Sequence, residues 1–383
     1  EPRCFLGSFD FSWEQRKLAS LCEKFTDGDW IESKDQSDFG VRLVQTGNVG
    51  VAEYLDKPNN KKWISEDTFD RLHCEEVLPG DILISRLPEP AGRACIVPLL
   101  GTKMITAVDC TIVRTAPDMS NKFLVQYLSS QAYFDDVNTC LAGGTRQRIS
   151  RGNLANFNVP IPVKKSEQDA IGMFFGYLDN LITLHQRKFE KLTNVKKSML
   201  EKMFPQNGSS YPEIRFKGFT DPWEQRKAKE LFVSTADKGY PELPVLSATQ
   251  DRGMIRRDEN SINIFHDKKN EAGYKRVLPG QFVIHLRSFQ GGFAHSAIEG
   301  ITSPAYTVFG FSEPEKHDSE YWKYVFTSKS FIRRLETVTY GIRDGRSISY
   351  EEFLTLGFVY PSKAEQTAIA RYLDKLSDLI TLH

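Results

Sequence analysis

The chain has 383 residues, which is enough for two domains of ordinary size, each with its own hydrophobic core. Its 26% charged and 40% hydrophobic residues are typical of a soluble globular protein. The formal net charge is zero, so a polyanionic partner would have to bind at local basic patches and not through a global field. No apolar run is long enough to span a membrane and no signal peptide opens the sequence, so we expect a cytoplasmic protein without a membrane partner.

The cysteine pattern argues against disulfide and zinc sites. All six cysteines lie in the first half of the chain, at Cys4, Cys22, Cys74, Cys95, Cys110 and Cys140. No two of them stand at C-x-x-C spacing, and the seven histidines do not pair at the spacing of metal ligands. We therefore expect reduced, mostly buried thiols and no metal.

Matched motifs divide the chain into two copies of one unit, roughly 200 residues each. Trp13–Lys17 (WEQRK) returns as Trp223–Lys227, and Leu181–His185 (LITLH) returns as Leu379–His383. Between these motifs, Val77–Asp81 (VLPGD) returns as 277–281 (VLPGQ), and Glu167-Gln168 returns as Glu365-Gln366. The sequences between the motifs differ almost completely, so we expect two versions of one domain, each recognising a different target.

Each copy begins with a mixed α/β globule, about 14–160 in the first copy and 224–361 in the second. Short β-rich runs next to Gly or Pro predict strands, as at Val41–Val44, 81–85 and 281–284. The segments 124–134 and 321–331 each predict one helix per copy.

A long helix is predicted after each globule. Ser166 with Asp169 resembles a capping box, and a narrow apolar stripe then continues to Phe204. This helix has about 39 residues, or roughly 58 Å at 1.5 Å per residue. A helix with one apolar stripe must lie against another. The expected partner begins at Ser362, with Glu365 at capping-box spacing, and we expect it to be truncated or to continue in a disordered tail.

These elements predict an α+β (mixed α/β) fold with a pseudo-two-fold tandem repeat. Two globular domains are separated by long helices that pack as an antiparallel coiled coil. The expected domains are 1–162 for the first globule, 163–206 for the central helix, 207–361 for the second globule and 362–383 for the second helix.

Three segments in each copy are candidates for nucleic-acid contacts. The most suggestive is the loop 143–148 with its counterpart 340–347, because paired glycines permit close approach and arginine and glutamine offer forked donors to base edges. Its candidate residues are Thr145, Arg146, Gln147 and Arg148, and then Arg343, Arg346 and Ser347. A solvated turn is the alternative, but recurrence in both copies favours nucleic acid.

The other two segments are a turn after the first strand and the run that follows the Leu-Pro-Gly turn. Small polar residues in the first, and arginines beside glycines in the second, favour contact with bases or phosphates. The candidates are Gln45, Thr46, Asn48, Arg86 and Arg93 in the first copy, and Ser247, Thr249, Gln250, Arg252, Arg287 and Gln290 in the second, with His285 beside them. Ordinary turn formation is the alternative.

Catalytic signatures are absent from the sequence. It has no P-loop, no Asn-Pro-Pro-aromatic segment and no glycine-rich loop of the cofactor-binding type. We therefore expect a recognition protein without catalytic residues.

The doubled order of these motifs resembles the specificity subunit of type I restriction-modification systems. The resemblance covers essentially the whole chain and implies two target-recognition domains that read a split, asymmetric sequence in double-stranded DNA. It also implies docking of two methyltransferase subunits and of restriction (translocase) subunits. S-adenosylmethionine, ATP and Mg would bind to those partners, with no cofactor in this chain. A coiled-coil scaffold without sequence-specific DNA binding and a stand-alone nuclease or methyltransferase with a degenerate site are the alternatives.

Overall fold

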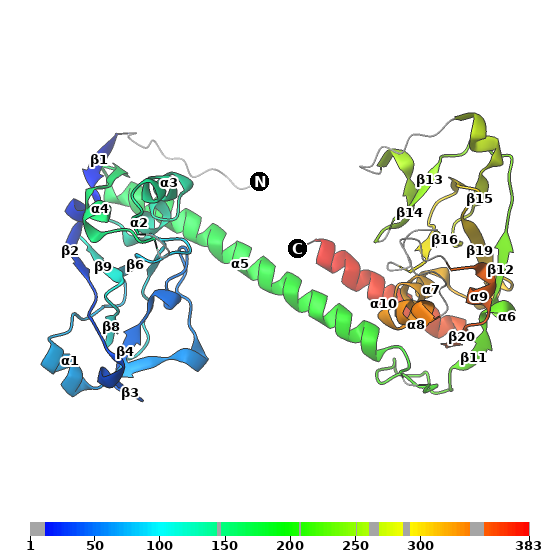
Figure 1. Cartoon of the computed structure of the whole chain (residues 1–383), viewed down its shortest axis with the longest axis horizontal. Helices are drawn as coiled ribbons and strands as arrows, with labels where there is room; N and C mark the ends of the chain where they lie inside the picture. Colours follow the sequence, from blue (N-terminus) through cyan, green and yellow to red (C-terminus); the bar gives the residue numbers. More distant parts are fainter. Residues whose placement is uncertain are drawn as a thin grey trace. The chain divides into compact units, whose positions relative to one another are not determined.

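The structure is a computed structural model, and it describes residues 12–143, 147–206, 208–249, 251–259, 268–285, 292–337 and 348–382 (Figure 1). The chain divides into two compact units, Glu1–Leu184 and His185–His383. Each unit has its own sheets and its own hydrophobic cores. Helices and strands are mixed in both units, which agrees with the predicted α+β class.

The first unit is built on two four-stranded sheets, with the strand orders β2-β9-β6-β7 and β3-β5-β4-β8. The strands of the first sheet are β2 (Cys22–Asp27), β9 (Cys110–Thr115), β6 (Ile82–Ser85) and β7 (Ala94–Ile96). Those of the second are β3 (Gln36–Ser37), β5 (Lys62–Ile64), β4 (Val41–Val44) and β8 (Met104–Thr106). Strands β4 and β6 are buried along their whole length. Both faces of these strands are therefore covered, and the strands predicted at 41–44 and 81–85 are present.

The second unit repeats one of these sheets. Its four-stranded sheet has the order β12-β19-β16-β17, and every neighbouring pair is antiparallel, as in β2-β9-β6-β7. These strands are β12 (Phe232–Thr235), β19 (Thr307–Phe311), β16 (Phe282–Ile284) and β17 (Ala294–His295). Two ribbons accompany the sheet, β13 (Leu246–Thr249) with β14 (Gly253–Arg256) and β15 (Lys275–Val277) with β18 (Gly300–Thr302).

The repeated WEQRK segment closes each globule. In the first unit it forms β1 (Trp13–Lys17), which pairs antiparallel with β10 (Asn158–Pro162). In the second unit β11 (Glu224–Lys227) pairs in the same way with β20 (Gly357–Tyr360). The pairing brings the start of each globule beside the strand that leads into the long helix. The motif therefore recurs because both units use the same closure.

The Leu-Pro-Gly turn has the same geometry in both units. Gly80 and Gly280 have φ angles of 96° and 85°, a region that only glycine adopts at little cost. The Leu78 N–H donates to the Asp81 carboxylate at 2.8 Å, and the Leu278 N–H donates to the Gln281 side-chain oxygen at 2.8 Å. Either side chain supplies the required acceptor, which explains why aspartate and glutamine interchange at this position.

The single helix predicted in each globule is wrong, because two short helices take its place. The first unit has α2 (Asn121–Tyr127) and α3 (Gln131–Thr139), and the second has α7 (Ser319–Phe326) and α8 (Lys329–Thr337). The Ser130 hydroxyl accepts the N–H of Tyr133 and caps α3, and Ser328 accepts the N–H of Phe331 in the same manner. The apolar periodicity continues across this break and conceals it in the sequence. The remaining short helices are α1 (Glu66–Leu72), α4 (Arg151–Asn156), α6 (Ala228–Leu231) and α9 (Tyr350–Leu354).

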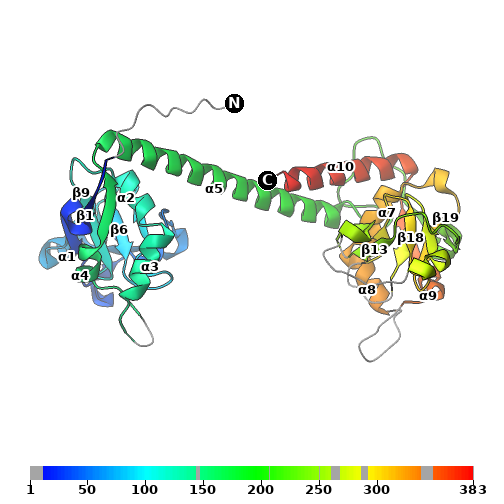
Figure 2. The same ribbon diagram turned by 90° about the horizontal axis from the view of Figure 1, so that it is seen from above.

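The long helix predicted to start at Ser166 is α5 (Lys165–Lys202), and its counterpart is α10 (Lys363–Thr381). Within the second unit the last part of α5 lies beside α10 and runs in the opposite direction (Figure 1 and Figure 2). Met199 and Leu200 pack there against the core that contains Ile369 and Leu373. Antiparallel packing of the two helices is therefore present in this unit, as predicted.

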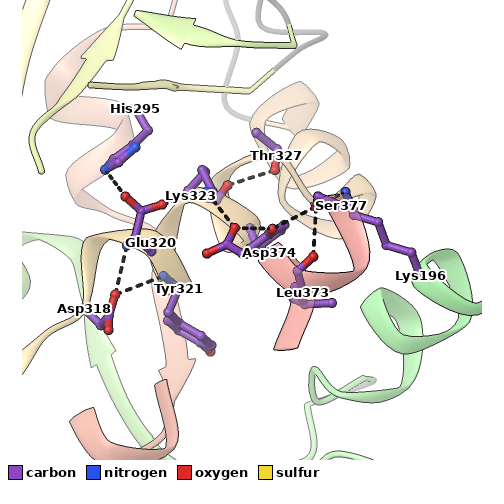
Figure 3. A network of polar contacts seen from close by, with 11 residues as sticks. Lys196, His295, Asp318, Glu320, Tyr321, Lys323, Thr327, Leu373, Asp374 and Ser377 are labelled. Atoms are coloured by element: carbon purple, nitrogen blue, oxygen red, sulfur yellow. Dashed lines mark hydrogen bonds and ion pairs between the residues drawn. The ribbon is translucent and has the colours of Figure 1, made fainter. Parts of the chain in front are cut away.

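Polar contacts also join these helices to the globule of the second unit (Figure 3). The Lys196 ammonium donates to the Ser377 hydroxyl at 2.7 Å, and Asp374 accepts from Lys323 at 3.0 Å and from the Tyr324 hydroxyl at 2.6 Å. The two helices and α7 are thus held together by side chains that the apolar stripe does not include.

The capping box predicted for α10 is not formed. Ser362 is the N-cap residue, but its side chain makes no capping hydrogen bond. The Glu365 carboxylate is 1% exposed and forms a two-point ion pair with Arg215 at 2.7 and 2.8 Å. The half-buried Arg215 binds this carboxylate, so the residue spacing was right for a cap but the contact is a different one.

The thiol prediction holds for the described cysteines. Cys22, Cys74, Cys95, Cys110 and Cys140 are free thiols, and three of them are buried. Burial raises the pKa of Cys22 to about 12 and the pKa of Cys74 to about 11, so both stay protonated at neutral pH. Cys4 lies outside the described residues.

Candidate nucleic-acid interface

Arg93 joins two of the segments that the sequence singled out in the first unit. Its guanidinium uses four of its five N–H groups to bind main-chain carbonyl oxygens. The acceptors are Val49 (2.6 Å from Nε), Leu87 (2.8 Å from Nη1), Pro90 (3.0 Å from Nη1) and Thr46 (2.9 Å from Nη2). The turn at 45–48 is therefore tied directly to the segment 86–93.

The turn itself is shaped by Asn48, whose side chain is buried. Its side-chain oxygen accepts the Gln45 N–H at 3.0 Å, and its amide nitrogen donates to the Leu55 carbonyl at 2.8 Å. Asn48 therefore positions the turn, and its buried side chain is not available to a base. Gln45 and Thr46 are half-buried and stay candidates for contact.

Arg86 is the first residue of the segment 86–93 and is only 8% exposed. Its Nη2 donates to the Val108 carbonyl at 2.6 Å, and its Nε lies 3.5 Å from the Asp27 carboxylate. The main chain of Arg86 also binds the residue that follows the loop 143–148, because the Ile149 N–H donates to the Arg86 carbonyl at 3.1 Å. The structure thus brings 45–48, 86–93 and the end of the 143–148 loop together.

These contacts correct the roles expected for Arg86 and Arg93. We expected both to contact bases or phosphates, but their guanidinium groups are bound to carbonyl and carboxylate oxygens inside the unit. Burial also lowers the pKa of Arg93. Both arginines hold the candidate loops in place. The sequence could not distinguish a bracing arginine from a reading one, because neighbouring residues do not tell whether a guanidinium is bound to the main chain.

Two exposed arginines lie next to this brace. Arg148 is 60% exposed on its side chain, with Nη1 3.7 Å from the Asp109 carboxylate. Arg151 is 47% exposed, with Nε 3.8 Å from the Asp27 carboxylate. Exposed ion pairs of this length contribute at most about 1 kcal/mol, so a DNA phosphate can replace either carboxylate at small cost. Arg151 was not among the residues predicted from sequence.

The position of Arg151 explains why it was missed. It is the first residue of α4, after Ser150, whose hydroxyl caps the helix by accepting the Asn153 N–H at 3.0 Å. The loop before it closes through paired main-chain bonds between Ala142 and Arg148, at 2.9 and 3.1 Å. Gln147 and Arg148 remain exposed at this closure. A basic residue three positions after Arg148 was the only available signal.

The second unit places its candidate turn differently. Ser247 is buried within β13, and Thr249 is the last residue of that strand. The Thr249 hydroxyl donates to the Gly253 carbonyl at 2.8 Å and accepts the Arg252 N–H at 3.1 Å. We had expected Ser247 and Thr249 in a turn that contacts nucleic acid. They instead belong to the strand β13 of the β13–β14 hairpin. Arg252 is exposed at the end of the hairpin.

The remaining predicted contacts lie outside the described residues, and they stay predictions. They are Thr145, Arg146, Gln250, Arg287, Gln290, Arg343, Arg346 and Ser347. Of their neighbours, His285 is half-buried, and burial lowers the pKa of its imidazole.

The described part of the chain has neither a cluster of metal-binding side chains nor a helix suited to a membrane. None of its His, Cys, Asp and Glu side chains form a group of three or more that is suited to a metal ion. Among the described helices, none has the length and apolar character needed to cross a membrane.

Comparisons with known proteins agree with a DNA-reading role. Residues 12–194 match the family model described as type I restriction modification DNA specificity domain. A crystal structure of a type I restriction-modification S subunit from M. genitalium is similar in fold, with a TM-score of 0.57, 13% identity, and coverage of 98% of this chain and 92% of that one. The HsdS subunit from Thermoanaerobacter tengcongensis aligns over 99% of this chain and 92% of its own, at 13% identity and a TM-score of 0.43. No curated protein matches the sequence.

Proposed function

We propose that this chain, whose residues 12–194 match the type I restriction modification DNA specificity domain, is a specificity subunit of this kind and that its two units read the two halves of one bipartite, asymmetric DNA target. The observation that carries the proposal is the convergence of three loops around the buried Arg86 and the half-buried Arg93, with Arg148 and Arg151 exposed beside them. Loops on a rigid scaffold are where recognition residues usually lie. The brace gives these loops one fixed shape, which sequence-specific contact requires.

Asymmetry of the target follows from what the units share and where they differ. The four-stranded sheet, the closing strand and the Leu-Pro-Gly turn recur in both units. One loop between these elements differs in the described residues, since the turn at 45–48 is replaced by the β13–β14 hairpin in the second unit. Different loops present different donors to the base edges, so the two half-sites should differ.

On this proposal, 1–162 and 207–361 are the target-recognition domains, and 163–206 and 362–383 are the helices that separate them. The family is non-catalytic, so the chemistry would belong to partners. We propose that two methyltransferase subunits and a restriction subunit bind this chain in the cytoplasm. Those partners would hold S-adenosylmethionine, ATP and Mg, while this chain supplies DNA recognition alone.

A domain exchange tests the proposal. Residues 20–155 are replaced by the matching segment of a relative with a different target, and the methylated sites are sequenced in cells that carry the complete system. One half of the methylated sequence should change, and the other half should stay the same. A change in both halves or in neither would contradict modular reading. Absence of any sequence-specific methylation by the unaltered system would favour the scaffold alternative.

A further inference from the structure

The repeated Glu-Gln pair at the start of both long helices has no place in DNA contact, because its side chains are buried. Gln168 is 2% exposed and Gln366 is 0% exposed. Glu167 and Glu365, directly before them, are buried as well. A polar pair buried at the same position in two units that otherwise differ must serve a purpose common to both.

Each glutamine joins three elements of its unit. The Gln168 side-chain oxygen accepts the Ser120 N–H at 2.9 Å, and its amide nitrogen donates to the Pro162 carbonyl at 2.9 Å. Ser120 is the N-cap residue of α2, and Pro162 ends β10. The first turn of α5 is thereby fixed both to a helix and to a strand of the globule.

The second unit repeats this bracket. The Gln366 side-chain oxygen accepts the Asp318 N–H at 2.9 Å, and its amide nitrogen donates to the Pro361 carbonyl at 2.8 Å. Asp318 is the N-cap residue of α7, and its carboxylate also accepts the N–H groups of Glu320 and Tyr321 (Figure 3). A carboxamide carries its acceptor oxygen and its donor nitrogen on two separate atoms, so glutamate cannot replace it without placing a carboxylate oxygen against the proline carbonyl.

The residue after each glutamine adds a second contact to the same N-cap residue, with donor and acceptor exchanged between the units. In the first unit the Ser120 hydroxyl donates to Asp169, and this hydrogen bond lowers the pKa of the Asp169 carboxyl. In the second unit the Thr367 hydroxyl donates to the Asp318 carboxylate at 2.5 Å. The hydrogen bond is kept although both of its residues have changed.

Close packing reinforces the bracket in the first unit. A Cβ atom on Gly172, one turn after Gln168, would lie 2.5 Å from the Phe123 nitrogen, so α5 approaches the main chain of α2 as closely as glycine allows. The Trp13 indole N–H also donates to Glu167 at 3.3 Å, which ties the closing strand to the helix. The globule therefore has little freedom to rock on the helix.

We propose that Gln168 and Gln366 are positioning residues that hold each recognition globule at a fixed angle on its long helix, and that they thereby set how strictly the protein measures the gap between half-sites. This inference rests on the proposed bipartite reading. The side-chain hydrogen bonds of both glutamines go to an N-cap residue and a strand end outside the candidate loops, so their loss relaxes the gap and leaves the choice of bases unchanged.

The test uses the full chain assembled with its methyltransferase subunits and a series of duplexes that differ only in gap length. The measured quantity is the affinity for the preferred gap divided by the affinity for a gap one base pair longer or shorter. Gln168→Met and Gln366→Met should each reduce this ratio roughly threefold to tenfold, the range that one or two lost hydrogen bonds represent. Gln131→Met is the matched control, because Gln131 is exposed on α3 and binds only Asp135 at 2.8 Å. It should leave the ratio unchanged.

If the methionine variants do not fold, a second pair of variants tests the contact between the long helix and the N-cap residue of α2. Ser120→Asp alone sets two carboxylates against each other, and it should broaden the gap preference. Ser120→Asp combined with Asp169→Thr copies the contact of the second unit, and it should restore the wild-type ratio. Rescue of this kind is not expected from a residue that only adds stability.

Three outcomes overturn the inference. They are an unchanged ratio in folded Gln168→Met and Gln366→Met, altered base preference in place of altered gap preference, and failure of the double variant to rescue the single one. A wild-type complex that binds without any gap preference would instead contradict the proposed bipartite reading itself. The two failures are therefore distinguishable.

Discussion

Four arginines near the candidate loops of the first unit fall into two groups. Their neighbours in the sequence do not show which group each belongs to. Arg86 and Arg93 are bound to main-chain oxygens, whereas Arg148 and Arg151 are exposed and held only by long ion pairs. The difference matters for function, because a bracing arginine acts on every loop that it joins. An exposed arginine acts only on the atom that it contacts.

Arg93→Met should test the brace. The substitution leaves four carbonyl oxygens without their donor, and we expect the free energy of unfolding of the first unit to fall by about 2–4 kcal/mol. Denaturant unfolding measures this loss, and selection from randomised duplexes should show relaxed preference in one half-site only. Arg151→Met is the control for stability and should cost about 1 kcal/mol or less. Equal losses in the two variants would contradict a bracing role.

Arg148→Ala and Arg151→Ala should weaken DNA binding in one of two recognisable ways. An arginine that forks onto a guanine contributes about 1–3 kcal/mol of discrimination, so its loss relaxes one base position. An arginine on a phosphate lowers affinity for all sequences and reduces the salt slope by about 1. Lys34→Ala, which removes a 75% exposed cation from the same unit, serves as control. If neither arginine variant binds more weakly than this control, the surface beside the brace is not the interface.

His317 should make the second unit sensitive to acid. Burial lowers the pKa of its imidazole, whose ring stacks on Phe311 at 4.7 Å. A base with a lowered pKa is held neutral by the fold, so stability is complete above the unfolded pKa of about 6.5 and declines as the pH falls below it. His317→Phe should keep the stacking and flatten the decline between pH 7.5 and 5.5 in denaturant unfolding. His295, whose pKa burial also lowers, should leave a residual slope. An identical slope in variant and wild type would rule out this role.

At the scale of elements, the long helix α5 belongs to both units. Helix α5 runs from Lys165 to Lys202, through the boundary between the two compact units. Beyond that boundary, Lys196 binds Ser377 and Met199 packs into the core that contains α10. A polar contact inside an apolar helix pair commonly fixes its register.

Duplicating the turn Leu192–Val195 should lengthen the measured gap. Four residues add roughly 6 Å at 1.5 Å per residue, which is one or two base pairs at about 3.4 Å each. They also rotate the apolar stripe by roughly 40° beyond a full turn, so some stability is lost. Methylation across duplexes of different gap length is the readout, and both half-sites should stay unchanged. An active variant that prefers the original gap would show that another element measures the distance.

At the scale of the whole molecule, the two units share a frame but fill it with different cores. Phe232 in the second unit contacts Phe309, Trp322, Phe326 and other rings within about the range expected for paired aromatics. The corresponding sheet of the first unit is packed mainly by aliphatic residues such as Ile82, Leu124 and Leu154. One topology thus tolerates different cores and different loops, as cores of matched volume generally do.

Several elements were predictable because their signals are local. The strands at 41–44 and 82–85 are short apolar runs, and the start of α5 follows a Pro-x-Pro strand and a charged first turn. Helices α2 and α3 were merged because apolar periodicity does not register a serine that caps a new helix. The candidate site was found in outline only. Loops 45–48, 86–93 and 143–148 were identified, but the bonds that hold Arg86 and Arg93 inside the unit are made to residues 22 and 47 positions away in the chain.

The sequence by itself determined the doubled architecture, several strands and the long helices, because repeated motifs and periodicity are properties of neighbouring residues. Only the tertiary structure decided which polar side chains face solvent and which hold the fold. Gln168 and Gln366 resemble ordinary residues of a helix in the sequence, yet each is buried against a helix N-cap residue that lies 48 positions earlier in the chain. Burial and hydrogen-bond partners arise from contacts between distant segments, so local spacing carries no record of them.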